Sequence, residues 1–110
     1  MKLNDIDLNL LVVFQQLVVE RRVNAVAQSL GITQPAVSNA LRRLRRHLAD
    51  ELFLRTSTGM EPTPFAARLV GPVAEALGTL HSALNQRTAF DPATSSRTFA
   101  IAMTDIGEIY

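Results

Sequence analysis

The stretch ITQPAVSNALRRLRRHL, residues 32–48, decides how this chain folds. Thr33 is a typical helix N-cap, and Pro35 falls in the first turn, where a missing N–H costs nothing. The stretch therefore predicts a helix that runs from Thr33 to about Ala49. At the helical repeat of about 3.6 residues per turn, its large apolar residues gather on one side: Val37, Leu41, Leu44 and Leu48.

A second, shorter helix is predicted just upstream, over residues 25–30, with Asn24 as its N-cap. Gly31 suits the left-handed conformation that ends a helix, and only Ile32 separates it from Thr33. Two helices joined by so short a turn predict a helix-turn-helix; an ordinary corner between two helices is the alternative. With Ala27 at the helix crossing, the expected core residues are Val26, Leu30, Ile32, Val37 and Leu41.

The opposite face of the 33–49 helix is polar and basic. Arg42 and Arg46 lie on it, flanked by Arg43, and with Arg45 the helix carries four arginines and no acidic residue. Residues 21–55 hold seven Lys/Arg and two Asp/Glu, although the whole chain has a net charge of only +1. Such a local excess predicts a phosphate-binding surface, and a merely solvated surface is the alternative. We expect Gln34, Ser38 and Asn39 to read bases and most of the arginines to grip the backbone.

Two further elements flank this unit. A first helix is predicted over residues 6–20, with Asn4 or Asp5 as its N-cap and Arg21 at its end. After the basic helix, residues 52–55 predict a strand, residues 56–59 a turn and residues 60–61 a return strand. This hairpin has the position of a wing, and Arg55 is its one basic residue. Arg55 is either a minor-groove or phosphate contact or an exposed loop arginine.

A long helix is predicted from Thr63 and Pro64 onward. Its apolar residues recur at spacings of three and four, which is typical of a coiled-coil seam: Ala66, Val70, Val73, Leu77, Leu80 and Leu84. We expect this seam to form a homodimer; packing on the first helix of its own chain is the alternative. Pro72 is expected to kink or weaken the helix.

Three segments follow from these patterns: a winged helix-turn-helix over residues 1–62, a linker and dimerisation helix over residues 63–89, and a third part over residues 90–110. In that third part, residues 90–96 have the composition of a linker, and RTFAIAMT, residues 97–104, alternates like a buried strand. A lone strand is not stable. We therefore expect the natural chain to continue into a second, α/β domain, truncated here after its first strand.

Several functional classes find no support in the sequence. The chain has no cysteine, and its two histidines, His47 and His81, accompany no nucleophile or carboxylate in a catalytic pattern. No glycine-rich phosphate loop or HExxH motif occurs. The longest apolar stretch, residues 8–19, is too short to span a membrane. We therefore expect no enzyme, no metal and no cofactor. A pure dimerisation module or a non-specific architectural DNA-binding protein are the remaining rivals.

The chain resembles the N-terminal part of a LysR-type transcriptional regulator. The resemblance is carried by NAVAQSLGITQPAVSNALRRLRRHL, by LFLRTSTGMEPTP and by the long helix, and it covers essentially all 110 residues. The segments DLNLLVVF, FLRT, GMEPTP and MTDIGEIY look most like the branch that regulates naphthalene, salicylate and nitrotoluene breakdown. The resemblance implies a bacterial, cytoplasmic, mainly α-helical protein that binds an inverted repeat in double-stranded DNA.

The resemblance also implies partners and site residues. Dimers pair into tetramers in the full-length protein, a small aromatic acid-like effector binds the missing domain, and RNA polymerase is a possible partner when a catabolic operon is activated. The implied base contacts are Gln34, Pro35, Ala36, Ser38 and Asn39. The implied backbone or minor-groove contacts are Thr33, Arg42, Arg43, Arg46 and Arg55. Thr104 and Asp105 would belong to the effector pocket.

The chain departs from the family pattern at two positions. Many members carry Arg where this chain has Asn39, which favours adenine over guanine as the base read there. Many also carry a second basic residue in the wing, where this chain has Thr58, so that minor-groove insertion depends on Arg55 alone.

Overall fold

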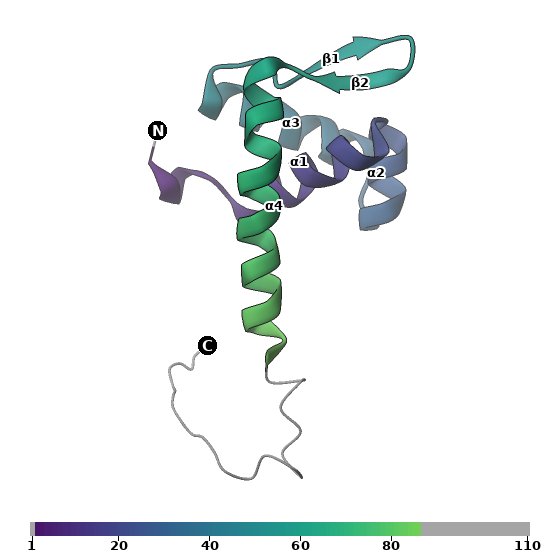
Figure 1. The fold of residues 1–110 in the computed structure, drawn as a ribbon. Coiled ribbons are helices and arrows are strands. Elements are labelled where there is room, and N and C mark those ends of the chain that lie inside the picture. The colour runs from purple at the N-terminus through teal and green to yellow at the C-terminus, as the bar shows by residue number, and fades with distance from the viewer. Residues whose placement is uncertain (1, 87–110) are drawn as a thin grey trace, which may run out of the picture. The chain divides into compact units, whose positions relative to one another are not determined.

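The computed structural model describes residues 2–86 and is mainly helical (Figure 1). A short 3-10 turn, Leu3–Asp5, precedes three helices, α1 (Leu8–Glu20), α2 (Val23–Leu30) and α3 (Gln34–Leu48). A two-stranded antiparallel sheet, β1 (Phe53–Thr56) and β2 (Gly59–Pro62), separates them from the long helix α4 (Pro64–Leu84). The expected winged helix-turn-helix followed by a long helix is confirmed. By its contacts the chain forms two units, one up to Leu77 and a second that starts at Gly78.

The core of the first unit lies between α1, α2, α3 and the sheet. Each helix turns one apolar stripe inward, and the ring of Phe14 meets that of Phe53 with centroids 5.5 Å apart. Fully burying side chains of this size contributes about 1.5–3 kcal/mol each. The largest buried side chains are Phe14, Phe53, Leu17, Leu44, Leu52, Val26 and Val37.

The starts of α1 and α2 differ from the expectation. Asp7, rather than Asn4 or Asp5, caps α1, because its carboxylate accepts a hydrogen bond of 2.9 Å from the backbone N–H of Asn9. Helix α2 begins at Val23, so Asn24 lies inside its first turn and is not the N-cap. The side chain of Val23 packs against the core, and its burial favours the earlier start.

The turn between α2 and α3 forms as predicted. Gly31 ends α2 with a φ of +69°, and the Thr33 hydroxyl accepts a hydrogen bond of 3.2 Å from the N–H of Ala36. Two residues expected in the core are less buried than predicted: Ile32 is 39% exposed, and Leu30 is only half-buried. The rest of the predicted helix-turn-helix core is buried: Val26, Ala27, Val37 and Leu41.

The hairpin is closed by the two-residue loop Ser57–Thr58, with Thr56 paired to Gly59 and Phe53 paired to Pro62. The first strand begins one residue later than expected. The reason is that Leu52 adopts a left-handed φ of +65°, which strand backbone excludes. Figure 1 shows the hairpin alongside the three-helix body.

Helix α4 begins at a buried cap. The Thr63 hydroxyl accepts from the N–H of Ala66 at 3.1 Å and donates to the Asp50 carboxylate at 2.7 Å. Between residues 64 and 73, α4 packs against the core of its own unit through Phe65, Leu69, Val70 and Val73. The start of the predicted seam therefore packs on the core of its own chain, and whether the first helix is its main partner stays a prediction. The helix continues through Pro72, and the expected kink stays a prediction.

In the second unit, the seam residues Leu80 and Leu84 are 43% and 73% exposed. No helix among the described residues is long and apolar enough to cross a membrane. The expected linker at residues 90–96, the strand at residues 97–104 and the effector candidates Thr104 and Asp105 lie outside the described residues.

Candidate nucleic-acid interface

The first half of α3 presents its polar side chains to solvent. The N-cap Thr33 and the five residues expected to contact bases are all exposed: Gln34, Pro35, Ala36, Ser38 and Asn39. Their orientation follows from the opposite face of the helix, where Val37, Leu41 and Leu44 are buried and fix the rotation of α3. The start of α3 is therefore free to meet a ligand surface.

A groove of about 420 Å³ runs between the start of α3, the α1–α2 connection and the hairpin. It brings Gln34 and Ser38 of α3 together with Arg55 of β1. Its lining is Arg21, Arg22, Val23, Asn24, Gln34, Ser38, Arg55, Thr56, Gly59 and Met60.

The lining of this groove is basic. Arg21, Arg22 and Arg55 are basic and none of the lining residues is acidic, although the Arg21 guanidinium is ion-paired with Glu61 outside the lining at 2.8 Å. Hydroxyl and amide groups of Ser38, Gln34 and their neighbours supply hydrogen-bond donors and acceptors beside that charge. A groove with this composition matches a polyanion whose edges carry hydrogen-bonding groups. Sequence reasoning counted Arg21 and Arg22 in the basic segment 21–55 but did not name them as site residues, because their positions in the chain indicated the end of a helix.

Asn39 and Arg42 form a pair beside the groove rather than within its lining. The Arg42 guanidinium donates to the Asn39 side-chain oxygen at 2.6 Å. A bidentate contact of Asn39 with adenine needs that oxygen as well as the amide nitrogen, so Arg42 would have to release it. Arg43 and Arg46 are exposed on the same helix.

Arg45 differs from the other three arginines of α3. Its guanidinium donates to the backbone carbonyl of Glu51 at 2.6 Å and to that of Phe53 at 2.9 Å. It therefore joins the end of α3 to the base of the hairpin, and it is not available to grip a phosphate. Arg45 is also the one arginine of this helix that was not among the expected backbone contacts, which are Arg42, Arg43 and Arg46.

A polar contact joins α1 and α2 outside the groove. The Glu20 carboxylate accepts hydrogen bonds from the Ser29 hydroxyl and from the Gln16 amide, the latter at 2.8 Å. The Ser29 bond, and then the Gln16 bond, lower the pKa of Glu20, while a small desolvation effect opposes them. Among residues 2–86, no three His, Asp or Glu side chains gather as a metal site.

Comparison with known proteins finds similarity to bacterial helix-turn-helix regulators. The sequence model of the bacterial regulatory helix-turn-helix proteins of the lysR family matches residues 8–67. Over 110 residues the chain is 64% identical to the HTH-type transcriptional activator NahR of Pseudomonas putida. It is 63% identical to the HTH-type transcriptional activator NagR of a Ralstonia species. The whole chain aligns, but it spans only 37% and 36% of those two proteins.

Two solved structures have the same fold. The probable transcriptional regulator PA0477 of Pseudomonas aeruginosa superposes with a TM-score of 0.75 at 46% identity, over 88% of this chain and 33% of that one. The BenM DNA-binding domain, crystallised with catB site 1 DNA, superposes with a TM-score of 0.71 over 82% of this chain and 99% of that one. At 22% identity, the second likeness concerns the fold alone.

Proposed function

The chain belongs to the LysR family of bacterial regulatory helix-turn-helix proteins, and from that premise we propose that it is the DNA-reading part of a sequence-specific transcriptional regulator. The observation that carries the proposal is the basic groove between α3 and the hairpin. There, hydrogen-bonding side chains of a helix face lie beside three arginines, which suits base edges flanked by phosphates.

Within this scheme α3 enters the major groove. Gln34, Ser38 and Asn39 make hydrogen bonds to base edges, while Pro35 and Ala36 supply apolar contacts for a thymine methyl. The backbone phosphates meet Thr33, Arg42, Arg43 and Arg46, and Arg55 of the hairpin reaches the adjacent minor groove or its phosphates.

The second half of α4 is the proposed dimer contact. Val70 and Val73 already pack on their own unit, so the contact between chains falls mainly to Leu77, Leu80 and Leu84. Leu80 and Leu84 are exposed, and large apolar side chains at seam spacing gain stability when a second helix covers them. Two copies related by twofold symmetry would bind an inverted repeat.

The activator names of the relatives and the branch resemblance extend the proposal to the full-length protein. We place this chain in a regulator that activates a catabolic operon in response to a small aromatic acid-like effector. That effector would bind outside the described residues. In the full-length protein dimers would pair into tetramers, and RNA polymerase would be a partner.

The test is a fluorescence-anisotropy titration of the chain with two DNA duplexes at several salt concentrations. One duplex carries an inverted repeat with a T and an A at its dyad-related ends, and the other has the same composition in scrambled order. Tighter binding to the repeat supports sequence reading. Equal binding to both with the same salt dependence would instead support non-specific architectural binding, in which the arginines act and the amides do not.

Variants sharpen this test. Gln34→Ala should cost about 1–3 kcal/mol of discrimination at one base step. Arg42→Ala should weaken binding to every sequence and lower the salt slope by about one phosphate contact. Gln28→Ala is the matched control, since Gln28 is an exposed glutamine of α2 outside the groove. If Gln34→Ala leaves the preference between operators unchanged, the base-reading assignment is wrong.

A further inference from the structure

The hairpin is fastened to the end of α1 by its backbone. The Met60 N–H of β2 donates to the backbone carbonyl of Arg21 at 2.7 Å. Arg21 is the C-cap of α1, and its φ of +67° is left-handed, an unusual conformation for a residue other than glycine. The carbonyl at the end of α1 is thus turned out of the helix and toward the hairpin.

Gly59 makes this approach possible. A Cβ atom at Gly59 would lie 2.7 Å from the Arg21 carbonyl oxygen and 3.3 Å from the Arg21 Cβ, and the backbone φ of Gly59 is +119°. Both the conformation and the space exclude a side chain. The backbones of the hairpin and of α1 therefore meet at a point where only a glycine fits.

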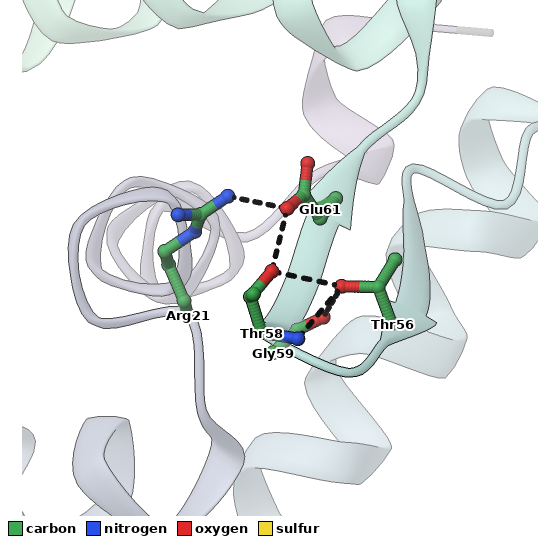
Figure 2. Close-up of polar contacts among 5 residues, drawn as sticks. All are labelled: Arg21, Thr56, Thr58, Gly59 and Glu61. Atoms are coloured by element: carbon green, nitrogen blue, oxygen red, sulfur yellow. Dashed lines mark hydrogen bonds and ion pairs between the residues drawn. The ribbon is translucent and has the colours of Figure 1, made fainter.

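Side chains extend the contact outward from that point (Figure 2). The Arg21 guanidinium forms an ion pair of 2.8 Å with the Glu61 carboxylate, which also accepts a hydrogen bond of 2.9 Å from the Thr58 hydroxyl. The Thr56 hydroxyl lies 3.1 Å from that of Thr58 and donates to the Gly59 carbonyl at 2.8 Å. One chain of contacts thus leads from α1 through the strand to the turn of the hairpin.

The network bears directly on Arg55. In the ladder Arg55 pairs with Met60, the residue whose N–H is bound to Arg21, and it precedes Thr56. Arg55 itself is exposed and lines the groove. We propose that the docking of the hairpin on the end of α1, made through Gly59, Met60 and Glu61 against Arg21, is a positioning contact for DNA recognition that holds Arg55 beside α3 before DNA arrives. The inference rests on the proposed function, because Arg55 needs a DNA ligand for its position to matter.

The two parts of the contact differ in strength. The ion-paired side chains of Arg21 and Glu61 are 44% and 42% exposed, so the ion pair by itself contributes little. The close backbone approach at Gly59 cannot be relaxed so easily. We therefore expect a substitution at Gly59 to displace the hairpin and one at Glu61 to loosen it.

The test is a double-mutant cycle measured by operator affinity. In the wild-type background, Arg55→Ala should weaken binding by about five- to tenfold, the usual effect of losing one charged contact. In a Gly59→Ala background, the same change should cost less than about twofold, because Arg55 is already displaced. If Arg55→Ala costs the same factor in both backgrounds, the two positions are independent and the inference fails.

Gly71→Ala is the matched control, because a Cβ added at Gly71 meets no atom within 4 Å. In that background the cost of Arg55→Ala should equal its wild-type value; a reduced cost there too would show a non-specific effect and overturn the inference. If Arg55→Ala has no effect even in the wild-type chain, the wing contact of the proposed function fails together with the inference. If Arg55→Ala weakens binding by the same factor in the wild-type and Gly59→Ala backgrounds, only the positioning role is overturned and the wing contact stands.

Glu61→Gln keeps the inference testable if Gly59→Ala does not fold. Removing one negative charge from the protein should strengthen binding to scrambled DNA, since phosphate repulsion decreases. Loosening the hairpin should weaken binding to the inverted repeat by about twofold, on the scale of an exposed ion pair. A fall in the ratio of specific to non-specific affinity supports the inference. If both affinities rise by the same factor, Glu61 only repels DNA and the inference is overturned.

Discussion

Arg45→Ala should destabilise the fold rather than weaken DNA binding. The lost hydrogen bonds are those to the carbonyls of Glu51 and Phe53, at 2.6 and 2.9 Å, the second partly buried. A hydrogen bond from a charged donor contributes about 1.5–3 kcal/mol. With 34% of the Arg45 side chain exposed, we discount the exposed bond and expect a loss of about 2–3 kcal/mol in total. The ion pair with Glu51 at 3.6 Å adds little.

The assay is thermal unfolding followed by circular dichroism at a fixed chain concentration. A domain of this size changes its Tm by about 4–8 °C per kcal/mol, so Arg45→Ala should lower the Tm by roughly 10–20 °C. Arg46→Ala is the matched control on the next residue of α3. The Arg46 side chain is exposed and makes no hydrogen bond or ion pair with the described residues 2–86, so its loss should leave the Tm nearly unchanged.

DNA titrations at several salt concentrations complete the comparison. Arg46→Ala should reduce the salt slope by about 0.9, the value for one phosphate contact. Arg45→Ala, measured well below its Tm, should leave the slope as it is. The opposite pattern, an unchanged Tm and a reduced slope for Arg45→Ala, would refute the reasoning and make Arg45 a phosphate contact like its neighbours.

Three other changes test separate contacts. Ser29→Ala should raise the pKa of Glu20 toward its ordinary value, as a carboxyl titration by NMR would show. The hydrogen bonds to Glu20 lower its pKa in the folded state. Their contribution to the stability of the fold is therefore present above the pKa of Glu20 in the unfolded chain, and it is lost as the pH falls through the pKa of Glu20 in the folded chain. Phe14→Ala should cost about 3–5 kcal/mol of unfolding free energy, measured by urea denaturation. Thr63→Val should cost about 2–3 kcal/mol, through the lost helix cap and the lost bond to Asp50, while Thr63→Ser should retain most of the stability.

The sequence predicted the elements well wherever one local signal determined the backbone. Gly31, Thr33 and Pro35 each carry a conformational preference that acts within a turn, and the turn between α2 and α3 formed as expected. Asn24 shows the limit of such reasoning. It has the preferred chemistry of a cap, but the burial of Val23 against the core favours an earlier start, and burial is decided by residues far away in the chain.

The candidate site could be predicted only in part for the same reason. The helical repeat placed Ser38 and Asn39 on the polar side of α3, and the hairpin signal identified Arg55 as the one basic residue of the wing. Periodicity does not show where a long side chain ends, so the bonds of Arg45 to the base of the hairpin were not foreseen. The contact between Arg21 and Gly59 was equally hidden, because it depends on how the hairpin folds back onto α1.

The docked hairpin has a kinetic consequence. A loop that is unordered in the free protein has to fold during the encounter with DNA, and each such step slows productive association. Here the Met60–Arg21 hydrogen bond and the fit at Gly59 already exist in the free chain. The rate of association should then be set by diffusion and by electrostatic attraction between the arginines and the phosphates. Variants that loosen the hairpin should accordingly bind more slowly, as well as dissociate faster.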